Sequence, residues 1–420
     1  MDKLPRDVLV SILYLLPMKE AARTSVLSRA WRDLWKHVLS LDLNVSPALS
    51  IRGANPGILG VNWVKLRHAL EEGHRGRLPE EFRVRVVLDE SSGLGFAIGK
   101  KVQILEIDLT PCWPEPCGAS YTFPRIPSLD FASMRSLKSL CLRHVNVGGV
   151  VLQLFLSQCP SLERLCVSGS DHLIDLIIPG PSPLELKHLD ISRCRRLESI
   201  IIAAPTPNLV SFRYDRSSVE LHVEDAPRLA ELTICGFTSA VQHSLWHYLP
   251  QLEALHLKVS EAQLLSVFFN IDGALFELKH LTLDVSDQFD PDDLNPVSLY
   301  SYLVEKAPSL NRLTLQMLDA PNKEDLEIPG PMLYTHASLE VVEIIGFDPR
   351  IRFFAVMLFR YWLENTSSLK RLVVDPRVPS LLGTTTSQYP MPAELREARD
   401  YASRLAKAIP LPLGVELVIV

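Results

Sequence analysis

Leu137-Lys-Ser-Leu-Cys-Leu142 and Leu162-Glu-Arg-Leu-Cys-Val167 are two copies of one short pattern, and this pattern decides the fold of the chain. A leucine leads each copy, a second apolar residue follows three positions later, and a third follows two positions after that. Apolar residues that alternate with polar or small ones are typical of a strand with one buried face. Each copy therefore predicts one short strand.

The pattern recurs through most of the chain. Further copies begin at Leu186, Leu209, Leu229, Leu252, Leu278, Leu310, Leu339 and Leu369, with a weaker copy over Val102–Leu109 and a closing strand over Gly414–Val420. The ten full copies begin 20 to 32 residues apart. This spacing resembles the leucine-rich repeat, in which one strand per unit lines a horseshoe. An ordinary α/β domain with parallel strands is the alternative, and near-regular spacing argues against it.

The segments between the strands differ in length. Between Ile191 and Leu229 they are short and rich in β-branched residues, as in Ile200–Ile202 and Val219–Val223, which predicts extended return segments. Helices are predicted in the longer units over Val150–Gln158, Glu261–Phe269, Val297–Lys306 and Arg352–Asn365.

The first forty residues follow a helical pattern instead. Apolar side chains recur at Leu9, Ile12, Leu13 and Leu16, which places them on one stripe of a helix. Pro5 suits the first turn of this helix, and Pro17 is expected to end it.

Two more short helices are predicted after this one. The first covers Lys19–Val26, and the second begins at a Ser28 cap, runs to Val38 and carries Trp31 and Trp35 on one face. Seven Lys/Arg against four Asp/Glu give residues 1–40 a net charge of +3, which favours an acidic partner.

Composition excludes several classes of protein. The 420 residues are 47% hydrophobic and carry a net charge of −6, which argues against bulk nucleic-acid binding. The seven cysteines form no paired metal-ligand spacing and are expected to be reduced and packed as small apolar side chains. No secretory signal and no apolar run of membrane-spanning length is visible, so the expected location is cytoplasmic and/or nuclear, with no membrane contact.

No catalytic, cofactor or metal site is predicted. The glycine-rich stretch Gly93–Lys101 lacks the Ser or Thr of a phosphate-binding loop and is expected to be a turn. Ser168–His172 gathers a nucleophile, an acid and a base in adjacent positions, which rarely reach triad geometry. His243 and His247 have helical zinc-ligand spacing but no evident third ligand.

The N-terminal helices resemble the F-box, the module that joins a substrate receptor to a Skp–Cullin–F-box (SCF) ubiquitin ligase. The stretch from Lys19 to Trp35 is very similar to plant F-box proteins, with Ala30 at a position where relatives often have a basic residue. The resemblance implies contact with a Skp-family adaptor, and through it a cullin, by Leu4, Pro5, Leu9, Ile12, Leu13, Leu16, Pro17, Val26, Leu27, Trp31 and Trp35. Ala337–Phe347 and Trp362–Leu372 resemble the C-terminal FBD region of plant F-box/leucine-rich-repeat proteins.

The expected fold is therefore an α/β solenoid that begins with a three-helix F-box, continues as an irregular leucine-rich-repeat horseshoe and ends in an FBD-like region. Its expected boundaries are 1–41 for the F-box, 42–100 for a linker and solenoid cap, 101–335 for the repeats, and 336–420 for the FBD-like repeats and cap.

The expected function is that of a non-catalytic substrate receptor of an SCF-type E3 ubiquitin ligase. Polar residues between the buried positions of the strands are expected to face a target protein from the inner side. They are Arg143, Asp190, Arg213, Asp215, His256, Lys258, Asp284 and Gln316, together with Ser168, Ser192, Thr233, Thr282, Thr314 and Glu343. The alternatives are a non-proteolytic scaffold and a small-molecule receptor, the latter without a visible cluster of basic and aromatic residues.

Overall fold

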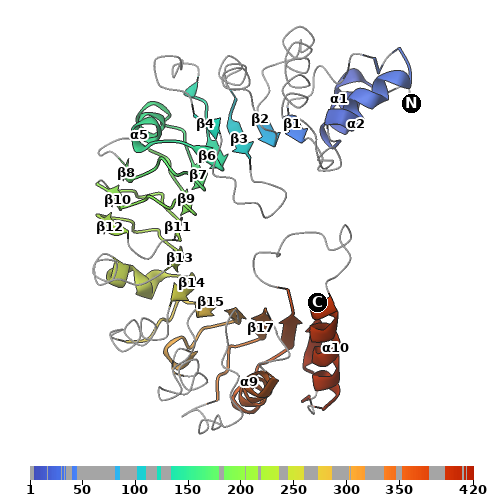
Figure 1. The fold of residues 1–420 in the computed structure, drawn as a ribbon, viewed down its shortest axis with the longest axis vertical. Coiled ribbons are helices and arrows are strands. Elements are labelled where there is room, and N and C mark those ends of the chain that lie inside the picture. Colours follow the sequence, from blue (N-terminus) through green and yellow to red (C-terminus); the bar gives the residue numbers. More distant parts are fainter. Residues whose placement is uncertain are drawn as a thin grey trace. The chain divides into compact units, whose positions relative to one another are not determined.

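The leucine pattern folds as a series of short parallel strands (Figure 1). The structure is a computed structural model, and it describes residues 4–16, 18–29, 31–32, 34, 40–44, 81–85, 102–109, 121–123, 134–178, 184–203, 205–215, 219–235, 245–259, 273–285, 302, 304–316, 335–346, 352–377, 393–408, 411–412 and 414–420. Met1–Arg228 and Leu229–Val420 are two compact units, called unit 1 and unit 2.

Unit 1 begins with a small helical module. Helix α1 covers Arg6–Tyr14 and has Pro5 at its N-cap, directly before the first turn in which it was predicted, and α2 covers Met18–Arg23. A short 3-10 turn, Thr24–Val26, follows directly. The predicted third helix is wrong over its described part, because Arg29, Trp31 and Arg32 lie in turns and Leu34 has 3-10 conformation. A helix this short gains little from local hydrogen bonding, so tertiary packing decides its form.

Seven parallel strands form the main sheet of unit 1. They are β1 Ser40–Asn44, β2 Glu81–Arg85, β3 Ile104–Asp108, β5 Ser139–Arg143, β7 Arg164–Ser168, β9 His188–Ser192 and β11 Ser211–Tyr214, in this spatial order. The leucine pattern sets the register, so that Leu140 pairs with Leu165 and Leu165 with Leu189. These three side chains are at most 1% exposed, which makes one face of the sheet a continuous apolar layer.

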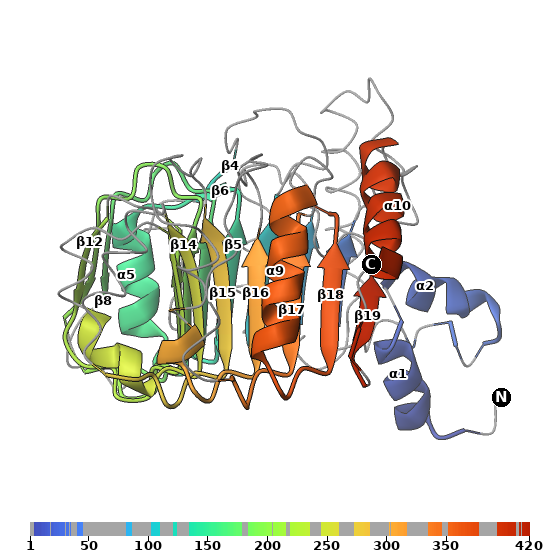
Figure 2. The same cartoon turned by 90° about the horizontal axis from the view of Figure 1, so that it is seen from below.

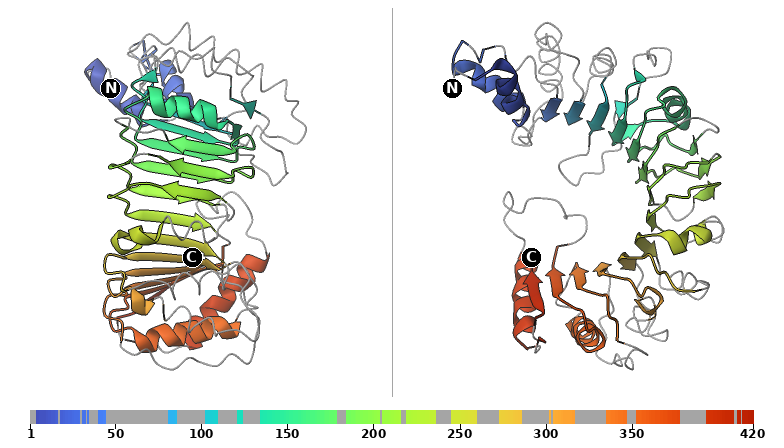
Figure 3. Two further views of the ribbon diagram at one scale, coloured as in Figure 1. Left: turned by 90° about the vertical axis from the view of Figure 1, so that its left-hand side faces the viewer. Right: turned by 180° about the vertical axis from the view of Figure 1, so that it is seen from behind.

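A second layer covers this apolar face. The short return segments form a parallel sheet of β8 Asp175–Ile178, β10 Ser199–Ile202 and β12 Glu220–Val223, which confirms the extended returns expected after Ile191. Helix α5, Gly149–Gln158, lies beside β8, and a two-residue pair joins β4 Tyr121–Thr122 to β6 Val145–Asn146 (Figure 3). Among the described residues, these elements cover the apolar face of the sheet of unit 1, and none covers its opposite face.

Unit 2 repeats the design with longer return segments. Its parallel strands are β13 Glu231–Cys235, β14 Ala254–Val259, β15 His280–Val285, β16 Arg312–Gln316, β17 Val341–Ile345, β18 Arg371–Asp375 and β19 Glu416–Ile419. Helix α9, Arg352–Asn365, lies over one face near β17, and α10, Ala393–Ala408, lies beside β19 (Figure 2). A 3-10 helix, Trp246–Gln251, precedes β14.

The predicted helices at α5 and α9 are confirmed. Residues 304–306 at the end of the third predicted helix are helical, whereas Glu261–Phe269 lies outside the described residues. None of the described helices combines the length and the apolar character that crossing a membrane requires.

Left-handed backbone at the strand ends joins consecutive repeats. His144, Gly169, Arg193 and Gly346 each follow a strand directly and have φ between 53° and 78°. The N–H of His144 donates to the Ser168 carbonyl at 2.7 Å, and that of Gly169 donates to the Ser192 carbonyl at 2.9 Å. The left-handed residue thus directs its N–H at the next strand of the solenoid.

Candidate protein-interaction surfaces

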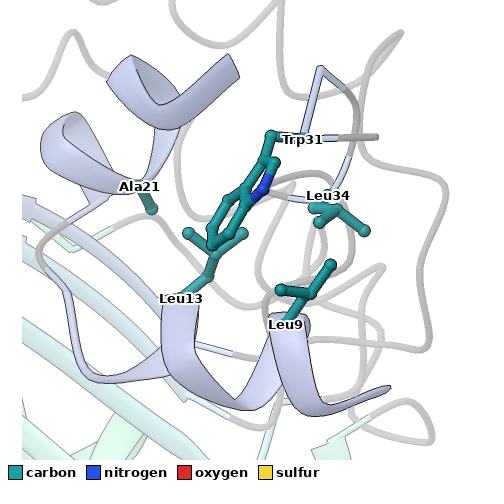
Figure 4. Packing of buried hydrophobic residues seen from close by; sticks show 5 residues of the cluster. All are labelled: Leu9, Leu13, Ala21, Trp31 and Leu34. Atoms are coloured by element: carbon teal, nitrogen blue, oxygen red, sulfur yellow. The ribbon is translucent and has the colours of Figure 1, made fainter. Parts of the chain in front are cut away.

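The N-terminal module has a small core of its own. Leu9 and Leu13 on α1 pack with Ala21 on α2 and with Trp31 and Leu34 from the turns that follow (Figure 4). All five side chains are at most 5% exposed. The indole of Trp31 lies over Leu13 in this core.

Other apolar side chains of the module remain exposed, and we call them the exposed apolar set. They are Leu4, Val8, Ile12, Leu15, Leu16, Val26 and Leu27, with exposed fractions of 38 to 86%. Val8 and Ile12 are four residues apart on α1, and Leu15 and Leu16 continue the same stripe in the turn beyond it. An uncovered stripe of this kind on a small module indicates a surface that another protein covers.

The structure divides the residues predicted to contact an adaptor into two groups. Six of them are exposed: Leu4, Pro5, Ile12, Leu16, Val26 and Leu27. Leu9, Leu13 and Trp31 are core residues of the module, so their side chains support the surface, and their contact with an adaptor stays a prediction. Pro17 and Trp35 lie outside the residues whose side chains are described.

Sequence reasoning also missed Val8 and Leu15. Helix α1 is apolar on nearly all sides, so periodicity alone did not show which stripe packs inward. The signal that could have found them is their own spacing with Ile12, at i, i+4 and i+7.

The uncovered face of unit 1, called its open face, has several ion pairs. The guanidinium of Arg143 on β5 lies 2.7 Å from Glu106 and 3.4 Å from Asp108, both on the neighbouring strand β3. On the next strands, Arg213 Nε lies 3.9 Å from Asp190 Oδ1. Burial raises the pKa of Asp190 above its usual range, although the charge of Arg213 opposes this.

The other predicted residues of this face have structural partners. Asp215 accepts a hydrogen bond from the backbone N–H of Arg193, which supports the left-handed turn there. Ser192 is buried, whereas Ser168 is half-buried. Glu106 and Asp108 were missed, although the weaker copy over Val102–Leu109 places them at the alternating polar positions.

In unit 2, the face of the sheet opposite the buried leucines Leu255, Leu281 and Leu313 is called its open face, and it is polar along its centre. His256 on β14, Thr282 on β15 and Thr314 on β16 are register partners, and Glu343 continues this row on β17. The Thr314 hydroxyl donates to Glu343 at 3.3 Å, and Arg312 lies 3.5 Å from the same carboxylate oxygen.

A second row of unit 2 contains Lys258, Asp284 and Gln316. Lys258 Nζ lies 3.1 Å from Asp284 Oδ2, and the Asp284 side chain is 5% exposed against 41% for Lys258. Lys258 is thus a partly exposed cation over a buried carboxylate, and Gln316 is half-buried beside it.

The apparent catalytic fragments are structural in the described part of the chain. The Ser170 hydroxyl accepts from the Val147 N–H at 2.9 Å and donates to the Val147 carbonyl at 3.0 Å, so it joins two turns. No cluster of three potential metal ligands occurs among the described residues. His247 is exposed, while His243 and Gly93–Lys101 lie outside those residues.

Comparison with known proteins agrees with this architecture. Residues 1–42 match the F-box domain, and residues 121–400, two thirds of the chain, match the At1g61320/AtMIF1 LRR domain. The chain belongs to the F-box/LRR-repeat family. F-box/LRR-repeat protein 13 of Arabidopsis thaliana is 24% identical over 89% of this chain and 88% of its own length.

Relatives of this F-box/LRR-repeat chain include proteins named for the FBD region. The F-box/FBD/LRR-repeat protein At1g13780 of Arabidopsis thaliana is 26% identical, with 89% of this chain and 90% of the relative covered. The FBD-associated F-box protein At1g66310 of the same plant is 24% identical, with 89% and 88% covered. The helical module at the N-terminus is thus an F-box, and the parallel sheets are the repeats of an LRR domain.

Proposed function

We propose that this chain is the substrate-recognition subunit of an SCF-type E3 ubiquitin ligase. Its F-box would bind a Skp-family adaptor, and through it a cullin, and the open faces of its repeats would bind a target protein. The exposed apolar set of the F-box is the observation that carries this proposal. Seven large apolar side chains in water favour association with the apolar surface of a partner.

The arrangement of the F-box supports the same division of roles. The side chains of Leu9, Leu13 and Trp31 hold α1 and α2 together, while Val8 and Ile12 face away from this core. A preformed surface of this kind binds without first ordering its own side chains, which lowers the entropic cost of association. The net charge of +3 over residues 1–40 would speed the approach of an acidic adaptor.

The repeats would contribute target recognition and no chemistry. Their open faces offer half-exposed cations such as Arg213 and Lys258 beside carboxylates, which suits a protein or peptide of mixed charge. The ligase would act by holding target lysines near a ubiquitin-charged E2 enzyme, so catalysis would come from proximity within the complex. In this role the protein would act in the cytoplasm, the nucleus or both.

Co-purification with a Skp-family adaptor tests the F-box half of the proposal. The intact chain is expected to form a stable complex, and the double variant Ile12→Asp, Leu16→Asp is expected to lose it, because two carboxylates would be buried without partners. Arg32→Asp is the matched control, since it changes the net charge by the same amount and Arg32 is exposed in a turn outside α1 and outside the exposed apolar set. Binding that survives the double variant, or a folded intact chain that binds no adaptor, would contradict the proposal.

Target capture tests the other half. Arg213→Glu is expected to weaken recovery of the target from plant extract and to leave adaptor binding unchanged, because Arg213 lies on a repeat strand and is half-exposed. A target whose half-life does not depend on the F-box would favour a non-proteolytic scaffold instead.

A further inference from the structure

Two cysteines lie side by side on the open face of unit 1. Cys141 on β5 and Cys166 on β7 are direct register partners, and each occupies the position between the two buried residues of its repeat. Neighbouring strands are about 4.8 Å apart, which lies within the Cα–Cα range of disulfides. Both side chains point away from the apolar layer of Leu140 and Leu165, and each residue is 7% exposed.

The two thiols are unequal. Cys141 hydrogen-bonds to the sulfur of Cys166, and this bond lowers the pKa of Cys166 and raises that of Cys141. The nearby charge of Arg143 also lowers the pKa of Cys166, whereas burial and Asp190 oppose the shift. A lowered pKa favours the thiolate, which is the attacking form of a cysteine, and the neighbouring thiol is already in place to resolve a sulfenic acid.

We propose that Cys141 and Cys166 form a reversible disulfide on the open face of unit 1 and that this pair is a modification site for hydroperoxides. The Cys166 thiolate would attack one peroxide oxygen, which forms a sulfenic acid and releases the other oxygen as water or an alcohol after protonation. The Cys141 thiol would then attack the sulfenic sulfur, which forms the S–S bond and releases water. The two thiols together lose two electrons, and the peroxide gains them.

Other described cysteines differ from this pair in burial or position. Cys159 and Cys194 are at most 2% exposed, and burial raises the pKa of Cys159 to about 12 and that of Cys194 to about 11. Cys235 is more exposed but lies in unit 2, on β13, where its register partner is Lys258. Within the described residues, the Cys141–Cys166 pair is therefore the place where two cysteines are direct register partners.

The modification would alter a surface with charged neighbours on both sides. Cys141 is the register partner of Glu106 on β3, and Cys166 is that of Asp190 on β9. A disulfide would remove the thiol hydrogen bond at the centre of this row and would fix β5 to β7. The disulfide itself does not depend on the proposed ligase role.

Peptide mapping of the intact chain tests the proposal. Fully reduced protein is treated with hydrogen peroxide, its remaining thiols are alkylated, and it is digested with trypsin. Cys141 lies in the peptide Ser139–Arg143 and Cys166 in Leu165–Lys187, so the expected product is a linked pair of these two peptides. Dithiothreitol is expected to abolish the pair, and Cys141→Ser is expected to leave a sulfenic acid at Cys166 that dimedone traps.

Controls exclude Cys112, Cys117 and Cys235. The linked pair is expected to persist in a Cys112→Ser, Cys117→Ser variant and in Cys235→Ser. Recovery of Cys141 and Cys166 as alkylated thiols, under peroxide that oxidises Cys235, would overturn the proposal. A linked pair that forms only in urea, or only between two chains on a non-reducing gel, would also overturn it. These outcomes use the wild-type sulfurs, so the test does not require that a Cys141 variant folds.

Discussion

His336 Nδ1 accepts a hydrogen bond from the backbone N–H of Leu339 at 3.1 Å, and its Nε2 lies 3.1 Å from the carbonyl oxygen of Ala307. An accepting Nδ1 places the single proton of a neutral imidazole on Nε2, which donates to Ala307. The His336 residue is 2% exposed, and burial lowers its pKa below the usual 6.5. A neutral histidine thus joins the turn before β17 to the end of the preceding repeat.

This arrangement predicts a loss of stability in mild acid. Unfolded His336 binds a proton near its usual pKa of about 6.5, while the folded protein excludes that proton until a lower pH. The contribution of His336 is therefore complete above pH 6.5 and is lost as the pH falls through the lower folded pKa. Between pH 7.5 and pH 5.5, the urea midpoint of unfolding should fall further for the wild type than for His336→Gln. An equal fall in the two proteins would contradict the prediction.

The neighbouring glycines Gly148 and Gly149 are expected to tolerate substitution by alanine to different degrees. A Cβ at Gly149 would collide with the carbonyl oxygen of Asp175 on β8, whereas one at Gly148 would lie 3.8 Å from the nearest atom, the His172 carbonyl oxygen. Gly149→Ala must push α5 from β8 and is expected to cost about 1–3 kcal/mol of unfolding free energy. Gly148 has an ordinary φ of −90°, so Gly148→Ala is expected to remain within about 0.5 kcal/mol of the wild type. Thermal or urea unfolding of both variants checks the difference, and equal losses would show that the backbone contact is not decisive.

The strands of the repeats were predictable because one physical requirement sets them. Each copy must place its apolar residues in one layer, and a slip of one residue would expose that layer, so the leucines fix strand and register together. The predicted strands at Leu278 and Leu369 are accordingly found at β15 and β18. The same register pairs Cys141 with Cys166, because both cysteines occupy the fifth position of their copies, but the cysteines were predicted only as small packed side chains.

The F-box was less predictable, because its apolar residues outnumber the places in its core. Spacing of four residues between Trp31 and Trp35 suggested a helix, but Trp31 enters the core from a turn. The spacing of apolar residues alone does not show whether Leu9 or Val8 points inward, since both belong to apolar stripes. Packing against Ala21 and Leu34 decides this, and those contacts depend on the whole module.

Trp31 and Val26 should separate stability from binding in the F-box. Trp31→Ala removes the largest side chain of the core and is expected to destabilise the module by about 3–5 kcal/mol, with adaptor binding lost as a consequence. Val26→Asp changes a side chain that is 86% exposed, so the fold should persist while adaptor binding weakens. Hydrogen exchange over residues 4–34 and adaptor co-purification measure the two effects. Amide protection that persists in Trp31→Ala, or that is lost in Val26→Asp, would contradict the assignment of Trp31 to the core and Val26 to the surface.

Lys258 and Asp284 are expected to be coupled in stability. Asp284 Oδ1 is buried and has no hydrogen-bond partner among the described residues, so Lys258 at 3.1 Å is the nearby charge that offsets its burial. Lys258→Met is expected to cost about 1–3 kcal/mol, less than for a fully buried pair because Lys258 is partly exposed to solvent. The double variant Lys258→Met, Asp284→Leu should recover much of that loss, since the uncompensated carboxylate is gone.

A double-mutant cycle from urea unfolding measures this coupling, with Asp284→Leu as its other single variant. A coupling energy near zero would show that the two side chains act independently.

The expected coupling also affects the choice of variants for target binding. Charge reversal at Lys258 would place a second carboxylate beside Asp284 and destabilise unit 2, so lost capture would not isolate a contact. Arg213 is the sharper choice, because its nearest carboxylate is 3.9 Å away and its side chain is half-exposed.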